Sequence, residues 1–395
     1  MRNRINSLKR AATSLPSRRR YESSLEAAVG WLLRSLEDGD RGSSAYFSLW
    51  GGWAKPYPET TGYVIPTLLD YARHSGRSAL RETAVNLGDW LIAIQQEEGY
   101  WYGMFHPPRT PEPSVFNTAQ ILLGLCALSR ETEEERWLEA AERGAGWLAE
   151  GVDEMGTWPA GGHYRTGHQP TYYTRVAWPM LEVAECTGRE DVRDAAGRVL
   201  HYALQERRDD GSFRNWAFQL GRPAFTHTIA YTLRGLIESA RLLDEWPTMG
   251  QPVEDALHRL WRLAELRQGR LPGAFEDGWK PVDYYTCLTG NAQVALCLLR
   301  WGGQTPDLRL LNGACKLVDN VCDGQVGAHH PFALLRGAVP GSRPLWGRYL
   351  TFRYPNWAAK FHCDALMALL QILAEVEKTS ESEETRKESR EVEEP

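Results

Sequence analysis

The stretch WAAKFHCDALMALLQIL, residues 357–373, decides the fold because it is the last of six related segments. It starts with polar and aromatic residues and continues with apolar residues at helical spacing. Alignment on a small first-turn residue, from Gly62 to Ala365, gives steps of 57, 58, 53, 62 and 73 residues. A repeat of this length predicts six copies of one supersecondary unit. The other segments are PETTGYVIPTLLDYA (58–72), VFNTAQILLGLCAL (115–128), YYTRVAWPMLEVAE (172–185), FTHTIAYTLRGLIES (225–239) and LTGNAQVALCLLRW (288–301).

A second, amphipathic helix precedes each apolar segment, as in SLEAAVGWLLRSLE (24–37) and EAAERGAGWLAEG (139–151). Each such helix stops at a signal rich in acid, amide and Gly, and an aromatic loop leads into the next apolar helix. Apolar helices must be buried and amphipathic ones must cover them. We therefore expect an all-α protein with a single (α/α)6 toroid over residues 21–378. An open solenoid would need polar capping repeats.

Composition narrows the class of protein. The chain has 395 residues, 43% of them hydrophobic, and a formal charge of -6, which argues against a general nucleic-acid binder. No apolar run reaches the ~20 residues of a membrane helix. Seven cysteines without a CxxC pair favour a cytoplasmic protein over a disulfide framework. The basic residues 1–20 and the acidic residues 379–395 are expected to be disordered arms, although the basic start also fits a transit peptide.

In a ring of hairpins all inner helices start at the same face, so their first turns should meet around one depression. Aromatic rings there would stack on sugar faces, while Arg, Asn and His would hydrogen-bond hydroxyls and carboxylates. The alternative is that polar first-turn residues only cap helices and that loop tryptophans only pack between hairpins. The candidate catalytic residues are His227, His362 and Tyr173. The candidate substrate-binding residues are Glu59, Asn117, Arg175, Asn291, Trp53, Trp101, Trp158, Trp216, Trp279 and Trp357.

A zinc site is the next candidate, because Cys287, His362 and Cys363 offer soft ligands. However, His362 and Cys363 are adjacent on a helix and point about 100° apart. No fourth ligand at familiar spacing appears. We therefore expect no metal or cofactor, and Cys363 is expected to be a packing thiol. The expected partner is a small molecule or an oligosaccharide, with no nucleic acid or membrane, and the oligomeric state stays open.

The hairpin ring resembles the six-hairpin carbohydrate enzymes, including uronate lyases and the N-acylglucosamine 2-epimerase family. In that epimerase family paired acid/base histidines open inner helices, where this chain has His227 and, inside KFH, His362. The match is partial: Ala230 stands where the family has a glutamate, and the pocket arginine of the first inner helix is missing. YPETTGY (57–63) is similar to bacterial toroid proteins associated with polysaccharide biosynthesis.

The ring also resembles the toroid of terpenoid cyclases, protein prenyltransferases and lanthionine cyclases. FEDGWKPVDYYTCLTG (275–290) is similar to a glycine-lysine-aspartate-tyrosine segment of prenyltransferase β subunits. That family's zinc-binding Asp-x-Cys and the DxDD motif of class II terpenoid cyclases are absent from the sequence. Lanthionine cyclases place a Cys-His pair after an earlier Cys, whereas the order here is His-Cys.

The favoured hypothesis is a carbohydrate-active enzyme, of the sugar epimerase or polysaccharide lyase type, in polysaccharide metabolism or biosynthesis. His227 and His362 would accept and donate a proton across the sugar. Arg175 and Asn117 would hold a carboxylate or enolate, and Tyr173 would act as base in a β-elimination. The alternatives are a terpenoid cyclase or prenyltransferase-like protein with a hydrophobic aromatic pocket, and a glycan-binding protein without catalysis.

Overall fold

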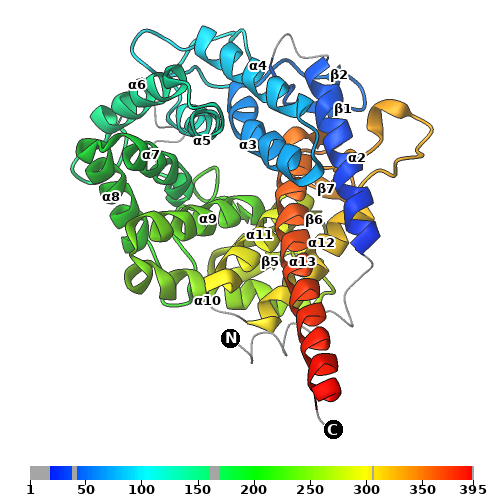
Figure 1. The fold of residues 1–395 in the computed structure, drawn as a ribbon. Coiled ribbons are helices and arrows are strands. Elements are labelled where there is room, and N and C mark those ends of the chain that lie inside the picture. Colours follow the sequence, from blue (N-terminus) through cyan, green and yellow to red (C-terminus); the bar gives the residue numbers. More distant parts are fainter. Residues whose placement is uncertain (1–17, 38–41, 160–168, 305–306, 394–395) are drawn as a thin grey trace.

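The computed structural model describes residues 18–37, 42–159, 169–304 and 307–393. In these residues twelve α-helices form a ring of six hairpins (Figure 1), so the predicted (α/α)6 toroid is confirmed. Each inner helix packs against the next, and the last inner helix returns to the first and closes the ring. The inner helices are α3 (Pro58–Ser75), α5 (Val115–Thr132), α7 (Thr174–Thr187), α9 (Thr226–Leu243), α11 (Leu288–Gln304) and α13 (Asn356–Glu393). The outer helices are α2 (Arg18–Glu37), α4 (Ala79–Ala93), α6 (Glu135–Gly151), α8 (Glu190–Gln205), α10 (Trp246–Leu266) and α12 (Leu308–Gly324).

Glycines allow the inner helices to approach closely near their N-terminal ends. A Cβ atom on Gly62 of α3 would lie 2.5 Å from the Cα atom of Ile121 on α5. A Cβ atom on Gly124 of α5 would lie 2.3 Å from the carbonyl oxygen of Gly62. These distances exclude any side chain, so α3 and α5 meet backbone to backbone.

The glycines predicted to end the outer helices also allow neighbouring segments to approach closely. Gly156 has φ 79°, a conformation that favours glycine, and its Cα faces the carbonyl oxygen of Arg198 on the next outer helix. Gly269 has φ 76° and lies in the same way against Lys316. The chain therefore turns inward where it touches the neighbouring hairpin.

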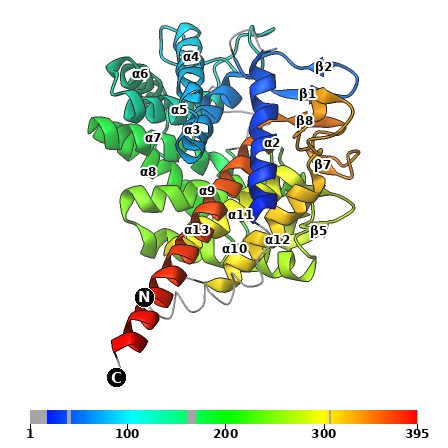
Figure 2. The same cartoon turned by 45° about the vertical axis from the view of Figure 1, so that its right-hand side comes forward.

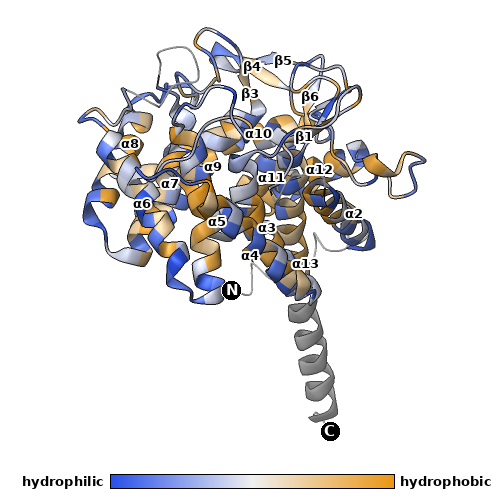
Figure 3. Cartoon of the chain, turned by 90° about the horizontal axis from the view of Figure 1, so that it is seen from above, coloured by the Kyte–Doolittle hydropathy of each residue, from blue (hydrophilic) through white to orange (hydrophobic). Residues whose placement is uncertain are grey.

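Short strands lie in the loops that precede the inner helices, and Figure 3 shows them on one face of the ring. We refer to this as the loop face. The long segment between the sixth outer helix and the sixth inner helix, after residue 329, contributes β7 and β8, which pair with strands from two other repeats. The sheets are β2 (Gly52–Trp53), β1 (Tyr46–Ser48) and β8 (Arg353–Pro355); β3 (Ala224–Phe225), β4 (Ala274–Glu276) and β5 (Lys280–Val282); and β6 (Thr286–Cys287) with β7 (Ser342–Arg343).

The basic residues 1–20 and the acidic residues 379–395, predicted to be disordered arms, are described only in part. Residues 1–17 and 394–395 lie outside the described residues, and α2 already begins at Arg18. Helix α13 continues to Glu393 and projects beyond the ring on the side away from the loop face (Figure 2). The acidic sequence alternates Glu with Lys and Arg three or four residues apart, which favours helix. Within the described chain, no helix is both long and apolar enough to cross a bilayer.

Candidate functional site

The inner helices carry polar residues along the face that points to the ring axis. On α3 these residues follow one another at spacings of four, four, three and four, and on α9 at four, three, four and three. Such spacing places them on one face of a helix. The axial residues are Glu59, Tyr63, Thr67, Asp70 and His74 on α3, and His227, Tyr231, Arg234, Glu238 and Arg241 on α9.

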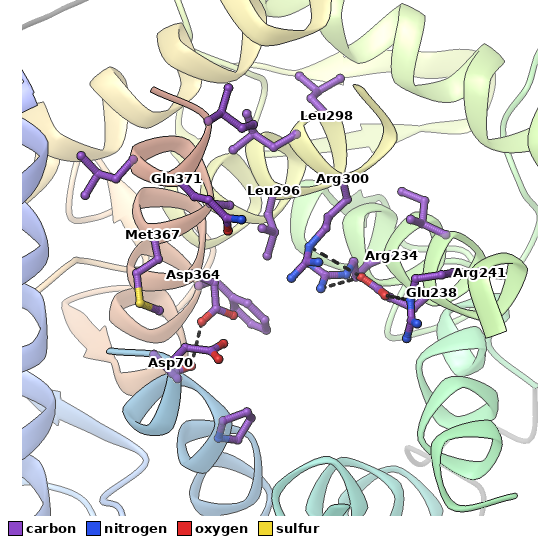
Figure 4. Close-up of a pocket in the computed structure, with 18 of the residues that line it drawn as sticks. Asp70, Arg234, Glu238, Arg241, Leu296, Leu298, Arg300, Asp364, Met367 and Gln371 are labelled. Carbon is purple, nitrogen blue, oxygen red and sulfur yellow. Dashed lines mark hydrogen bonds and ion pairs between the residues drawn. The ribbon is translucent and has the colours of Figure 1, made fainter. Parts of the chain in front are cut away.

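A cavity of about 1950 Å³ occupies the ring axis between the C-terminal halves of the inner helices. Its walls combine apolar side chains with a dense set of charges, several of which point into the open space in Figure 4. The lining residues in the first two turns of the inner helices include Tyr63, Arg175, Lys360 and Phe361. They form the floor of the cavity, and its mouth lies opposite the loop face.

Arg175 is the most unusual residue of this floor. It is 2% exposed, and its guanidinium lies 4.7 Å from the Trp178 ring, 5.2 Å from Tyr231 and 5.9 Å from Phe361. Its Nε and Nη2 atoms have no hydrogen-bond partner among the described residues. Burial lowers the pKa of Arg175 to about 10, so the side chain remains cationic at neutral pH. A buried, unsatisfied cation is costly, and an anionic ligand would remove that cost.

Glu59 lies one helical turn beyond Tyr63, toward the loop face. Its side chain is 6% exposed. Burial raises the pKa of Glu59 to about 7, while a hydrogen bond from Tyr57 and the charge of Arg175 act in the opposite direction. Its carboxyl group therefore changes protonation near neutral pH, as a general acid or base requires.

His227 completes the cluster on the α9 side. Its Nδ1 lies 3.1 Å from the amide oxygen of Gln293, and its ring lies 4.2 Å from that of Tyr231 and 5.2 Å from that of Tyr349. Burial lowers the pKa of His227 to about 3, so the imidazole is neutral over the physiological range. Tyr349 comes from the excursion after residue 329 and is held by Trp357, whose Nε1 donates to its hydroxyl at 2.8 Å. The excursion thus covers the cluster from the loop face.

An ion-pair network lines the cavity on α5, α7, α9 and α11. Glu238 lies 2.7 Å from Arg234, 3.2 Å from Arg241 and 3.9 Å from Arg300. Glu182 lies 2.8 Å from Arg130 and 3.3 Å from Arg241. The charges of these arginines hold the pKa of Glu238 below its usual value despite burial. Glu238 is therefore anionic, and each of the two glutamates is shared between at least two arginines.

The wall formed by α3 and α13 carries a second, smaller charged group. Asp364 accepts a hydrogen bond from Thr67 Oγ1 at 2.7 Å and pairs with Lys360. Asp70 lies nearby and pairs with Arg73 at 2.5 Å. Burial and the charge of Asp364 raise the pKa of Asp70. The cavity therefore has a wall rich in arginine facing a wall in which acids and bases balance.

The structure does not bring His227 and His362 together. His362 is fully buried between α13 and the outer helices, where its Nε2 lies 2.8 Å from Ser24 Oγ and 3.8 Å from Cys322 Sγ. His362 therefore does not line a common depression with His227, contrary to the prediction. Burial lowers the pKa of His362 to about 3, like that of His227.

The reason is a difference in helix register. The small first-turn residues Ala230 and Ala365 are 135 positions apart. The axial residues of α9 and α13 correspond at a separation of 130, as in Arg234 and Asp364. A shift of five residues rotates a side chain by about 140° from its predicted direction, because each residue turns the helix by 100°. His362 consequently faces outward.

The predicted tryptophans do not ring the cavity. Trp101, Trp158, Trp216 and Trp279 are buried, and none of the six is among its lining residues. Trp101 Nε1 donates to the carbonyl of Leu91 at 2.8 Å, and Trp158 Nε1 donates to that of Leu148 at 3.0 Å. These indole N–H groups therefore supply hydrogen bonds to carbonyl groups in the last turns of outer helices. Trp53 packs on Trp31 with ring centroids 5.0 Å apart.

The predicted polar residues other than Arg175 also make internal contacts. Asn117 donates to the carbonyl of Tyr102 at 3.3 Å, and Asn291 donates to that of Gly269 at 2.6 Å. Tyr173 is 2% exposed and packs against neighbouring aromatic rings. Of the thirteen candidate residues, all of them described, Arg175 alone lines the cavity.

The cysteines do not assemble into a metal centre in the described part of the chain, where no group of three or more His, Cys, Asp and Glu side chains is suited to hold a metal. Cys287 accepts a hydrogen bond from the Gly290 amide at 3.3 Å on the loop face. Cys363 is fully buried in α13 among core residues. Burial raises the pKa of both thiols.

Sequence reasoning missed the charged residues of the cavity because it examined only the first turns of the inner helices. The sequence pattern that indicates these residues lies further along the inner helices. Arg234, Glu238 and Arg241 follow Tyr231 at helical spacing inside a helix that is otherwise apolar. A charged stripe on a buried helix indicates a polar cavity, because such groups are rarely buried without partners.

No family model matches the sequence. A curated relative, squalene–hopene cyclase of Zymomonas mobilis, is 27% identical over 192 residues, which are 46% of this chain and 26% of that enzyme. The chain therefore spans about a quarter of that relative's length.

Solved structures match over almost the whole chain. An unsaturated glucuronyl hydrolase specific for heparin has a TM-score of 0.72 and 16% identity, covering 92% of this chain and 99% of its own. Cellobiose 2-epimerase of Spirochaeta thermophila has a TM-score of 0.72 and 16% identity, covering 91% and 97%. The corresponding enzyme of Bacillus thermoamylovorans has a TM-score of 0.73 and 12% identity, covering 90% and 98%. The chain shares their α/α toroid fold. At this identity the likeness shows the fold alone.

Proposed function

We propose that the protein is an enzyme acting on an acidic carbohydrate, with Arg175 binding the sugar's carboxylate and Glu59 transferring a proton. One observation carries the proposal. A buried arginine, two of whose guanidinium nitrogens have no hydrogen-bond partner among the described residues, lies at the floor of a large cavity. Its charge acts on the carboxyl group of Glu59 behind this floor, whose pKa burial raises to about 7.

The chemistry follows from these two groups. A carboxylate bound to Arg175 would have its charge stabilised when the neighbouring carbon loses a proton and an enolate develops. Ionised Glu59 would accept that proton, leaving the electron pair on the enolate. Returning a proton to the opposite face gives an epimer, whereas loss of an oxygen leaving group gives an unsaturated sugar. Epimerase and lyase reactions therefore share this first step.

His227 would have a different role from the acid–base role expected of it. With its pKa lowered to about 3, the ring does not gain a proton near neutral pH. Held by Gln293 and covered by Tyr349, it would present a neutral imidazole as a hydrogen-bonding group. Glu59 is then the group of the cluster that titrates near pH 7.

The structural neighbours support the carbohydrate class, since those named above are a glucuronyl hydrolase and cellobiose epimerases. A second candidate, a terpenoid or prenyl pocket, is favoured by the match to squalene–hopene cyclase and by the aromatic rings around Arg175. The charged cavity walls argue against it, because an isoprenoid chain would leave those charges without partners.

Proton abstraction can be tested directly in deuterium oxide. Uronate-containing oligosaccharides are incubated with the protein, and exchange at the carbon beside the carboxylate is followed by NMR. We expect exchange in the wild type and a loss of roughly 10²-fold or more in Glu59→Gln, the scale of lost acid–base catalysis. Glu82→Gln, an exposed first-turn glutamate on the outer helix α4, is the matched control. Equal exchange in wild type and Glu59→Gln would refute the proposal.

A further inference from the structure

The ion-pair network of α5, α7, α9 and α11 contains more positive than negative charge. Together with Arg175 it has five arginines against two glutamates, a net charge of +3. Glu131 lies outside it and pairs with Arg73 and Arg81. We call this set the arginine wall: Arg130, Arg175, Arg234, Arg241, Arg300, Glu182 and Glu238.

Within the described residues, the surplus charge of the arginine wall is balanced only in part, by Asp364 and Asp70, whose charges act on Arg300. Arg175 is 2% exposed, and two of its guanidinium nitrogens have no partner among the described residues. The Nε atom of Arg234 also has no hydrogen-bond partner among the described residues. Arg300 reaches Glu238 only at 3.9 Å, and the charge of Arg234 is the main cause that lowers the pKa of Arg300. Like charges are thus held together around open space.

We propose that the arginine wall binds a second, strongly acidic group of the ligand, a phosphate or sulfate ester, between Arg234 and Arg300. This inference rests on the proposed function, in which Arg175 holds the sugar's carboxylate. A tetrahedral oxyanion offers several acceptor oxygens that two guanidinium groups can share, whereas one carboxylate is satisfied by one arginine. The substrate class is therefore an acidic sugar that also carries a phosphate or sulfate.

The size of the cavity agrees with a ligand larger than one sugar. At about 1950 Å³ the cavity exceeds the roughly 300–1,000 Å³ of ordinary small-molecule sites. Arg175 lies at its floor, and Arg234 and Arg300 lie further along the axis toward the mouth. A ligand with two acidic groups would lie along this axis.

Isothermal titration calorimetry tests the inference without any turnover. Inorganic phosphate, pyrophosphate, sulfate and glucuronate are titrated into the full chain at constant ionic strength. We expect at least one of the three oxyanions, phosphate, pyrophosphate or sulfate, to bind at one site and more tightly than glucuronate. Comparison of phosphate with sulfate then distinguishes the two esters.

Variants locate the binding. Arg300→Gln should weaken oxyanion binding roughly 10- to 100-fold, the loss expected for one charge-assisted hydrogen bond. Arg300 makes only the long contact to Glu238 within the network, so this variant should fold. Arg136→Gln on the outer helix α6 is the matched control and should bind like the wild type. Glu238→Gln raises the net charge of the wall and should tighten binding. If Glu238→Gln does not fold, Arg300→Gln decides alone.

Two results would overturn the inference: glucuronate binding as tightly as every oxyanion, or equal affinities in Arg300→Gln and Arg136→Gln. The proposed function fails separately. Oxyanion binding without deuterium exchange would leave the arginine wall as a binding site and refute the proton-transfer chemistry. Deuterium exchange without oxyanion binding would support the proton-transfer chemistry and refute the arginine wall as an oxyanion site.

Discussion

The two ends of the inner helices differ in what fills the ring axis. At the loop face, Glu59 and His227 lie beneath strands, loops and Tyr349, and both are nearly inaccessible. At the other end the same helices diverge around an open cavity lined by Arg234, Asp364 and their partners. A toroid can therefore be sealed by loops at one end while its axis remains open at the other.

This difference separates close backbone packing from an open, charged cavity along one set of helices. Near the loop face, glycines such as Gly62 and Gly124 bring backbones into contact. Toward the mouth, ion pairs such as Arg234 with Glu238 replace apolar packing. Arg175 lies at the boundary, surrounded by aromatic rings and open to the cavity. Substitutions should consequently have different effects at the two ends and their largest effect on activity at this boundary.

The largest effect is expected for Arg175→Met. Because this side chain would hold the developing negative charge, kcat/KM for a uronate substrate should fall by roughly 10²- to 10³-fold, as for the loss of one oxyanion donor. Arg73→Met, at the cavity lining but paired with Asp70 and Glu131, is the control and should change kcat/KM by less than about threefold. Similar kinetics for the two variants would remove the distinction between floor and rim.

The next effect concerns stability. Gly62→Ala should destabilise the protein by about 3 kcal/mol, because its Cβ would lie 2.5 Å from a backbone atom of Ile121. Gly302→Ala, in the C-terminal half of α11, meets nothing within 4 Å and should stabilise by about 0.5–1 kcal/mol. Urea denaturation measures both. If both glycines tolerate alanine equally, the helices are not more tightly packed at the loop face.

An effect of similar size, about 3 kcal/mol over the full pH range, is expected from the buried Glu59. Its folded-state pKa is raised from the ordinary 4.5 to about 7, so the folded protein binds more protons than the unfolded chain between these two pH values. Stability therefore decreases as pH rises through this window. Glu59→Gln has no such charge to bury. Melting temperatures should show the variant gaining on the wild type from pH 4.5 to pH 8, and a constant difference would contradict the assignment.

Much of the architecture was predictable from sequence, whereas side-chain direction in the site was not. The six apolar segments and the turns at Gly156 and Gly269 identified the hairpins, because periodicity and glycine requirements are local properties. Arg175 was identified as a pocket residue. His362 was misplaced because an error of a few residues in register turns a helical side chain away from the axis. The sealing of the loop face depends on contacts between distant loops, which no local pattern encodes.

The smallest effect on activity is expected at His362. Since His362 packs against Ser24 outside the axis, His362→Gln should retain activity, whereas His227→Gln should lose part of it. With the folded-state pKa lowered to about 3, the unfolded chain binds more protons between pH 6.5 and 3, so stability falls on acidification. His362→Gln should unfold at lower pH than the wild type in an acid titration followed by circular dichroism. A large loss of activity in His362→Gln would restore its predicted catalytic role.

Binding of a sugar carboxylate to Arg175 is the central claim, and side-chain NMR tests it most directly. In protein with nitrogen-15-labelled arginine, the Nε–H signal of Arg175 is assigned by its absence from Arg175→Lys. Titration with glucuronate should shift this signal in a saturable way, while the signal of Arg136 on the outer surface stays unchanged. If glucuronate leaves Arg175 unshifted, or shifts both signals alike, the floor of the cavity does not bind the sugar.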